Sequence, residues 1–261
     1  MLVLVPPSEG KAAGARRGAP VDLGRLSLPG LNGARSAVLD ELVELCAADE
    51  DKAVDVLGLT PGLRGEIAKN AALRTAPALP AARLYTGVLY DALGLATLDR
   101  AARRRADRSL LVFSGLWGAL RLTDRVPAYR CSMSVRLPAA GGLAAYWRPF
   151  MDEVLPEAAG SGLVLDLRSS AYAAAWKPRG PLAGRTATVR VLQVTVVDGV
   201  EKRMVVSHFN KATKGRLLRT LLESGARPKT PGALAGVLRE LGFTVEEAPG
   251  GRLDVLVREL H

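Results

Sequence analysis

Small polar or basic residues follow three apolar stretches that have the length of buried strands. The stretches and the residues that follow them are Leu2–Val5 with Ser8-Glu9-Gly10-Lys11, Leu110–Phe113 with Ser114-Gly115, and Leu163–Leu167 with Ser169-Ser170. In a parallel α/β sheet, the loops that leave the carboxyl ends of neighbouring strands converge on one crevice. The sequence therefore predicts a common site if these strands are parallel, although serine and glycine also serve there as ordinary turn residues.

A second group of candidate residues is an arginine-rich segment. Between positions 121 and 136 the only acid is Asp124, and the four arginines are Arg121, Arg125, Arg130 and Arg136. Guanidinium groups bind phosphates bidentately and stack on bases, and Tyr129 would add a stacking face. This pattern predicts a phosphate-facing loop. An equally good interpretation is that Arg130 is structural and holds a carboxylate such as Asp124.

The third group lies between positions 203 and 219, where five cations occur without an acid. They are Arg203, Lys211, Lys214, Arg216 and Arg219. We expect a strand over Arg203–Phe209 and a helix over Ala212–Glu223, which places three of these cations at the start of the helix. The helix dipole favours anions at that end, so the pattern indicates an anion-binding site. A solvated basic face is the alternative.

Lys11, Ser114 and Lys211 are the candidates for a catalytic function. A buried lysine with a lowered pKa can act as a base or a nucleophile. The sequence contains no Walker P-loop, no GxGxxG after a strand, no GxSxG and no HExxH. With two histidines, and two cysteines outside any CxxC motif, it predicts neither a metal site nor a cofactor.

The elements that must position these residues are predicted to form a single α/β domain over residues 1–261. An Asp198-Gly199 turn between two β-prone stretches predicts an antiparallel hairpin, and Thr244–Ala248 and Arg252–Arg258 read as the last strands. Elsewhere, segments whose apolar residues recur at helical spacing lie between the predicted strands. We therefore expect a mixed (α+β), partly antiparallel sheet surrounded by helices.

Residues 36–75 are predicted to be helical. Apolar spacing indicates helices over Ser36–Ala48, Asp51–Val56 and Glu66–Leu73, with the glycine-rich Leu57–Gly65 before the last of them. Helix-hairpin-helix DNA modules use such a turn to direct backbone N–H groups at a phosphate. A plain corner between two helices is the alternative.

Composition favours anionic partners. The 261 residues carry a formal net charge of +10, with 48% hydrophobic and 24% charged residues. A GC-rich coding sequence can also enrich arginine without selection for binding. The apolar runs are too short to cross a membrane, the first residues do not resemble a signal peptide, and two cysteines suit a reducing cytosol. We expect a cytoplasmic protein with no membrane partner.

Several segments, in this order along almost the whole chain, resemble the YaaA peroxide-stress protein family. They are Pro6–Lys11, Tyr85–Tyr90, Ser114–Arg121 with Asp124, Pro127–Arg130 with Met133, Tyr146-Trp147, Leu163–Tyr172 and Asn210–Gly215. The resemblance implies a mixed α/β fold, a cytosolic location, a helix-hairpin-helix element and a basic cleft that binds double-stranded or branched DNA. It further implies a function in limiting oxidative damage linked to intracellular iron, and it implies no catalytic residue.

Two functions follow as hypotheses. The first is a DNA-binding peroxide-stress protein whose basic cleft contacts phosphates through Lys11, Arg121, Arg125, Tyr129, Arg130, Lys211, Lys214 and Arg216. The second is an enzyme that modifies a nucleotide or nucleobase, a nucleotide-like anion, in a basic pocket. An open groove would favour the first, and a deep enclosed pocket the second.

Overall fold

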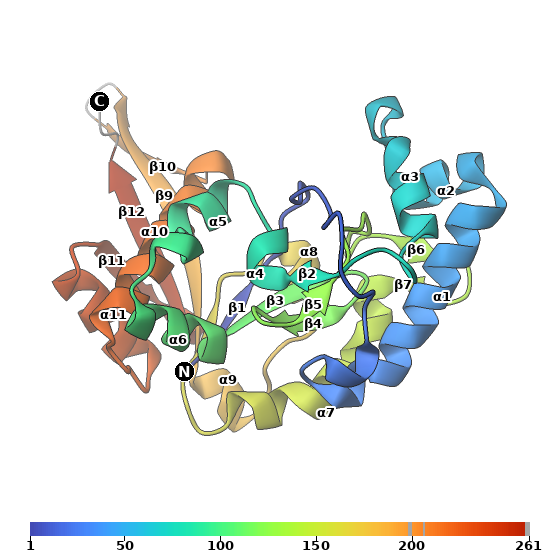
Figure 1. The fold of residues 1–261 in the computed structure, drawn as a ribbon. Helices are drawn as coiled ribbons and strands as arrows, with labels where there is room; N and C mark the ends of the chain where they lie inside the picture. Colours follow the sequence, from blue (N-terminus) through green and yellow to red (C-terminus); the bar gives the residue numbers. More distant parts are fainter. Residues whose placement is uncertain (198–199, 206, 259–261) are drawn as a thin grey trace.

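The computed structural model describes residues 1–197, 200–205 and 207–258, and its centre is a mixed sheet (Figure 1). Among the described residues eight strands form this sheet, in the order β11-β12-β9-β8-β1-β3-β4 with β10 paired to β9. In chain order they are β1 (Leu2–Val5), β3 (Leu110–Ser114), β4 (Gly118–Arg121), β8 (Val164–Asp166), β9 (Thr186–Val197), β10 (Val200–Met204), β11 (Thr244–Ala248) and β12 (Arg252–Arg258). Two small ribbons add β2 (Leu79–Pro80) with β5 (Arg125–Val126), and β6 (Arg136–Leu137) with β7 (Gly141–Gly142). The predicted fold class is confirmed.

The middle of the sheet is parallel. Strand β1 pairs with β3 on one side and β8 on the other, so that Leu4 lies opposite Leu111 and Asp166. Every residue of β1, β3 and β8 is buried, as expected for parallel strands covered on both faces. Their carboxyl ends therefore lie at one edge of the sheet, which is the condition that a common site requires.

The outer pairings are antiparallel. Strand β4 pairs with β3, β11 with β12, and β10 with β9. The predicted Asp198-Gly199 turn lies outside the described residues, but the strands that flank it are antiparallel as expected. The partly antiparallel character of the sheet is thus confirmed.

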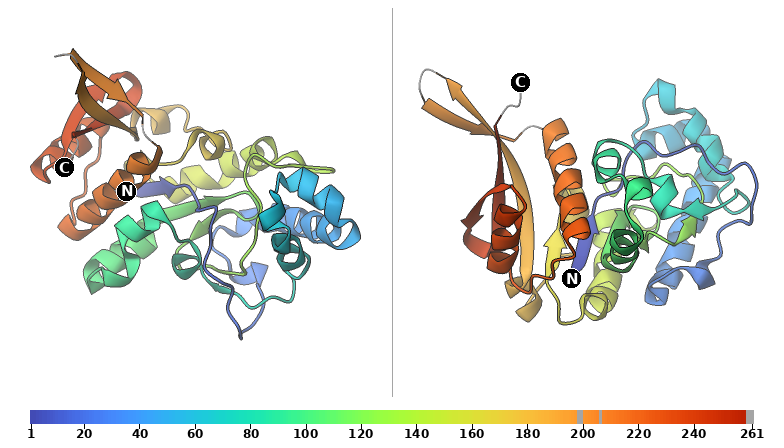
Figure 2. Two further views of the ribbon diagram at one scale, coloured as in Figure 1. Left: turned by 90° about the horizontal axis from the view of Figure 1, so that it is seen from above. Right: turned by 60° about the vertical axis from the view of Figure 1, so that its left-hand side comes forward.

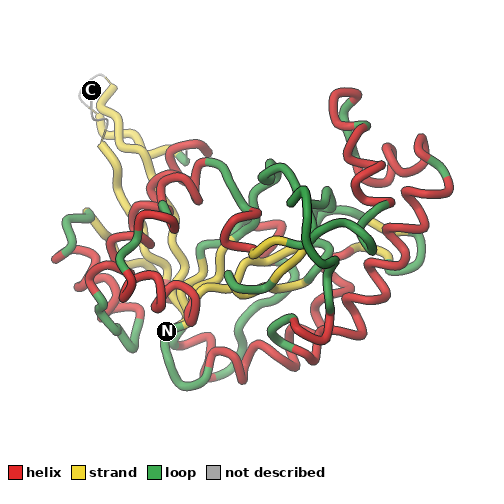
Figure 3. The backbone as a smooth tube through the Cα atoms, viewed as in Figure 1, coloured by secondary structure: helices red, strands yellow, loops and turns green. Residues whose placement is uncertain are grey.

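Helices surround the sheet, as the tube view shows (Figure 3). In chain order they are α1 (Asn32–Ala48), α2 (Glu50–Leu57), α3 (Gly65–Ala71), α4 (Ala81–Leu84), α5 (Val88–Leu93), α6 (Arg100–Ser109), α7 (Leu143–Ala159), α8 (Ser170–Ala173), α9 (Pro181–Gly184), α10 (Ser207–Ser224) and α11 (Pro231–Glu240). Helices α10 and α11 both contact β9 and lie on either side of it in the right-hand view of Figure 2. Within the described residues, no helix combines the length and apolar character that a membrane span needs.

The basic segment departs from the prediction. The strand expected over Arg203–Phe209 is wrong in its second half, because β10 ends at Met204 and α10 already begins at Ser207. Its β-prone residues are overridden by packing, since Gly215 of α10 lies directly against the Leu89 carbonyl of α5. Lys211 consequently lies more than one turn inside the helix, and the expected placement of the cations at the helix start is wrong. The side chain of His208, which was expected on a strand, lies outside the described residues.

The helical part folds back on itself. Helix α2 ends at Gly58, which adopts φ 61°, and a 3₁₀ turn at Pro61–Leu63 leads into α3. Arg64 pairs with Glu50 at 2.9 Å and with Asp51, so its charge is used within the segment. The glycine-rich turn is present between two helices, and its contact with DNA remains a prediction.

Candidate functional site at the strand exits

The loop after β1 closes over the carboxyl edge of the sheet. The Lys11 Nζ donates to the Ser8 carbonyl at 3.1 Å, and Lys11 also forms a β-bridge with Tyr85. The Ser8 Oγ accepts the Thr86 N–H at 3.1 Å. The ammonium group is therefore folded back beneath its own loop.

Three hydroxyl groups form a chain under this lysine. The Tyr129 Oη lies 2.6 Å from the Ser114 Oγ and 2.9 Å from the Tyr85 Oη, and the Ser114 Oγ accepts the Trp117 N–H at 2.9 Å. The Lys11 Nζ lies 4.3 Å from the centre of the Tyr129 ring, within range of a cation–π interaction. Because Tyr129 is 2% exposed, its ring packs against Lys11 and has no free face on which a base could stack.

Burial sets the protonation of this group. Loss of hydration lowers the pKa of Lys11 to about 8, with Glu9 opposing the shift and Arg130 adding to it. Burial also raises the pKa of Tyr85 and of Tyr129. Lys11 therefore loses its proton far more readily than an exposed lysine, whereas the tyrosines beside it remain protonated hydrogen-bond donors.

Arg130 lies beside Lys11 and contacts Glu9. Its Nη1 donates to the Glu9 carbonyl at 3.1 Å, and its Nη2 lies 3.7 Å from the Glu9 Oε2. The Tyr172 Oη donates to the Glu9 Oε1 at 3.5 Å. Arg130 and Lys11 line a small cavity of about 170 Å³ together with Glu9 and Glu66.

The interpretation of Arg130 as the partner of Asp124 is wrong within the described residues. The Asp124 carboxylate accepts the Ser27 N–H and hydroxyl at 2.9 and 2.8 Å and the Arg121 N–H at 2.8 Å. These contacts fix the turn between β4 and β5. Arg130 lines the cavity and contacts a different carboxylate, that of Glu9, its only carboxylate partner in the part of the chain that the structure describes.

The exit of β8 carries a buried ion pair. The Arg168 side chain donates to the Asp166 carboxylate at 2.9 and 2.7 Å and also to the carbonyls of Tyr172 and Trp176. The Lys214 Nζ donates to the Leu167 carbonyl at 3.2 Å, and burial lowers its pKa while Asp166 opposes the shift. This exit is thus rigid, and its cations are bound to backbone and carboxylate oxygens.

The predicted site residues separate into three groups. Lys11, Ser114, Tyr129 and Arg130 lie together at the exits of β1 and β3, and Lys214 lies at the exit of β8. Lys211 and Arg216 are exposed on α10. Arg121 donates to the Arg108 carbonyl, next to the start of β3, and Arg125 donates to the Ala78 carbonyl. These last two lie away from Lys11.

Comparison with known proteins agrees with the motifs. The sequence model of the family described as peroxide stress protein YaaA matches residues 1–248. The chain belongs to this family. It is 67% identical to a UPF0246 protein of Streptomyces coelicolor over 100% of both chains. UPF0246 proteins of Corynebacterium efficiens and Corynebacterium glutamicum are 42% and 39% identical, over 94% and 95% of this chain and 95% and 96% of theirs.

Some contacts of the site in this YaaA family member were not predicted. The Tyr172 Oη donates to the Glu9 carboxylate, and the Tyr90 Oη donates to the Pro6 carbonyl at 2.7 Å. In the sequence, Tyr85, Tyr129 and Tyr172 lie in three separate segments, and no local signal connects them. Only the fold brings these segments together.

The lowered pKa of Lys11 predicts how the stability of this YaaA family member depends on pH. Below about pH 8 Lys11 is protonated in the folded and unfolded states, and the cost of burying its charge is fully present. Between about pH 8 and 10.5 only the unfolded chain keeps the proton, so this cost falls as the pH rises. Over this pH range the free energy of unfolding of the wild type should rise by up to about 3 kcal/mol on account of Lys11. The Lys11→Met variant should lack this rise.

Urea unfolding of the two proteins at a series of pH values across this range measures the difference. The thiol of Cys131, whose pKa burial raises to about 12, changes stability in the opposite direction. Lys11 itself acts on this thiol, so the two proteins are best compared below about pH 9, the ordinary pKa of the thiol, where the thiol keeps its proton in the folded and unfolded states. Parallel pH profiles for the variant and its parent would show that Lys11 titrates like an exposed lysine.

Proposed function

We propose that this YaaA family member binds double-stranded or branched DNA in the cytoplasm during peroxide stress. The observation that carries the proposal is a pair of exposed cations on α10, Lys211 and Arg216. From Ser207 to Leu222 the helix sequence holds cations but no acid, and Lys211 and Arg216 are exposed. A formal net charge of +10 adds long-range attraction for a polyanion. The two free cysteines, Cys46 and Cys131, suit a reducing compartment.

The exposure of each basic residue decides whether it would contact DNA. A duplex contacts side chains that reach the surface, so Lys211, Arg216 and Arg130 are the phosphate ligands in this proposal. Lys11 is half-buried and Lys214 is buried, and both donate to backbone carbonyls, so they would shape the edge of the sheet rather than contact phosphate. Such binding is independent of base sequence and depends steeply on salt.

Titration of a duplex at several salt concentrations tests the proposal. Each phosphate contact adds about 0.9 to the slope of log affinity against log salt, so Lys211→Gln and Arg216→Gln should each lower the slope by about one unit. Lys177→Gln is the matched control, because this exposed lysine lies beside Asp152 of α7 and Pro181 of α9, away from α10. Absence of binding at low salt, or an equal effect of Lys177→Gln, would contradict the proposal.

A second candidate function is modification of a nucleotide or nucleobase. It is favoured by one observation, that Lys11 lines a cavity of about 170 Å³ with a pKa lowered to about 8. An amine that is neutral in part of the molecules near neutral pH can accept a proton or attack an electrophilic carbon. Arg130 would hold an anionic group of the substrate.

Incubation with nucleotides and nucleobases, followed by mass spectrometry of the products, tests this second function. Lys11→Met should abolish product formation and leave the salt dependence of DNA binding unchanged, because the lysine would act only on the reacting group. The matched control is Lys69→Met, which removes another lysine that lines the same cavity. Equal product from wild type and Lys11→Met would eliminate Lys11 as the reacting group.

A further inference from the structure

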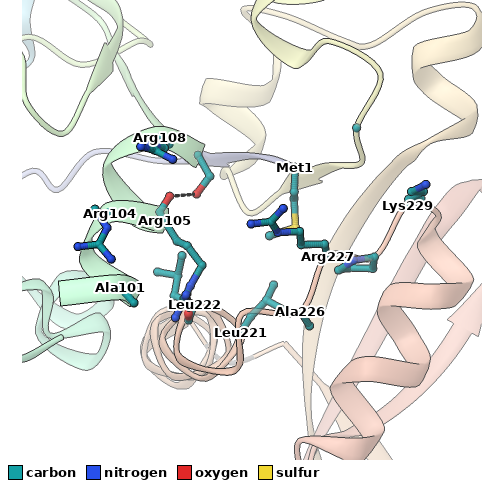
Figure 4. Close-up of a pocket in the computed structure, with 13 residues that line it drawn as sticks. Met1, Ala101, Arg104, Arg105, Arg108, Leu221, Leu222, Ala226, Arg227 and Lys229 are labelled. Carbon is teal, nitrogen blue, oxygen red and sulfur yellow. Dashed lines mark hydrogen bonds between the residues drawn. The ribbon is translucent and has the colours of Figure 1, made fainter. Parts of the chain in front are cut away.

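A second, larger cavity lies on the other side of the sheet from the strand exits. Its volume is about 490 Å³, within the range of small-molecule sites. Figure 4 shows α6 on one side, with Arg104 and Arg108, and the loop after α10 on the other, with Arg227 and Lys229. Met1 and Gly162, which precede β1 and β8, complete the wall. The cavity therefore lies at the amino ends of the parallel strands.

The rim of this cavity is cationic and unneutralised. Arg104, Arg108, Arg227 and Lys229 are exposed, and among the residues that line the cavity in the described chain none is acidic. Acids on the same helices pair elsewhere: Asp107 binds Arg103 at 3.0 Å and Glu223 binds Arg219 at 2.8 Å. Four like charges around one hollow repel one another, and an anion bound among them would relieve that repulsion.

The floor of the cavity is apolar and fixed. Leu221, Leu222 and Pro228 are buried there, and Ala101 and Ala226 line it as well. Arg105 is not available to a ligand, because its Nε donates to the Leu222 carbonyl at 2.6 Å and its Nη2 to the Glu223 carbonyl at 3.3 Å. Arg105 thus satisfies the open carbonyls at the end of α10 and holds α6 against it.

We infer that this cavity binds an organic phosphate with a planar, weakly polar body, of the class of a nucleoside phosphate. The apolar floor would accept the body, and the guanidinium groups of the rim would bind the phosphates bidentately. Arginine also stacks on planar rings, which suits a base more than a flexible chain. A free inorganic anion would meet the rim but leave the floor uncovered.

Isothermal titration calorimetry with ADP, pyrophosphate and adenosine tests the inference. ADP should bind at least about tenfold more tightly than either part alone, because only ADP meets both floor and rim. Arg108→Gln and Arg227→Gln should each weaken ADP binding about tenfold through loss of a charge-assisted hydrogen bond. Lys211→Gln, near the opposite end of α10 from the cavity-lining Leu221 and Leu222, is the control and should leave ADP binding unchanged.

Three results would overturn the inference. Pyrophosphate binding as tightly as ADP would reduce the cavity to a nonspecific cationic rim, and adenosine binding as tightly would remove the rim from the site. Unchanged ADP affinity in both arginine variants would place the ligand elsewhere. Because these arginines are exposed, thermal unfolding of the variants should match the wild type. The test is separate from DNA binding, which is assigned to α10 and the strand exits.

Discussion

Replacing Arg35 with methionine should lower the free energy of unfolding by about 3–5 kcal/mol. The side chain is fully buried, and its guanidinium group donates to the Trp117 carbonyl at 3.1 Å, the Ala119 carbonyl at 2.7 Å and the Ser27 carbonyl at 2.8 Å. Burial lowers its pKa to about 10, with Asp124 opposing the shift. Methionine fills the space but leaves these buried acceptors without a donor.

Arg35 also joins parts of the chain that are far apart. It connects the start of α1 with the turn between β3 and β4, which directly follows Ser114 of the candidate site. Urea unfolding measures the loss, and Arg83→Met, on the exposed side of α4, is the matched control with an expected change of less than about 0.5 kcal/mol. Equal losses in the two variants would show that the Arg35 hydrogen bonds add nothing to stability.

Local sequence patterns correctly predicted the strands that are apolar along their whole length. Leu2–Val5 forms a strand with the expected boundaries, and a stretch ending at Phe113 extends only to Ser114. Such segments are apolar throughout and bounded by turn residues, so tertiary contacts agree with local preference. The prediction failed after Met204, where a β-prone sequence is helical because Gly215 allows α10 to approach α5 closely. That contact lies more than 100 residues away along the chain and leaves no local signal.

The candidate site was predicted in part for the same reason. Strand exits can be found from local signals, and parallel pairing brings Lys11 and Ser114 to one edge. The partners of the charged groups could not be found in this way. Arg130 contacts Glu9, 121 positions away, rather than the nearby Asp124, and Tyr129 is covered by Lys11 instead of facing solvent. The sequence gives the charge and size of each side chain, but its spacing does not show in which direction the side chain points in the fold.

The second large effect is expected at the buried pair behind the exit of β8. Arg168→Leu should lower the free energy of unfolding by about 3–5 kcal/mol, because it leaves the Asp166 carboxylate without its cation. The carbonyls of Tyr172 and Trp176 lose their donor at the same time. The Arg168 guanidinium also lies 4.2 Å from the centre of the Phe113 ring, so the pair is enclosed by the core.

A double variant separates the cost of the orphaned charge from the value of the pair. When Asp166→Leu accompanies Arg168→Leu, both charges of the pair are removed, and the buried Lys214 ammonium, whose charged form Asp166 had favoured, stays at this exit. Because the orphaned carboxylate is gone, the double variant should be more stable than Arg168→Leu alone by about 1–3 kcal/mol. Urea unfolding of the wild type, both single variants and the double variant completes the cycle. Losses that simply add would mean that Asp166 and Arg168 stabilise the exit of β8 independently, through their backbone contacts, and that their ion pair contributes little.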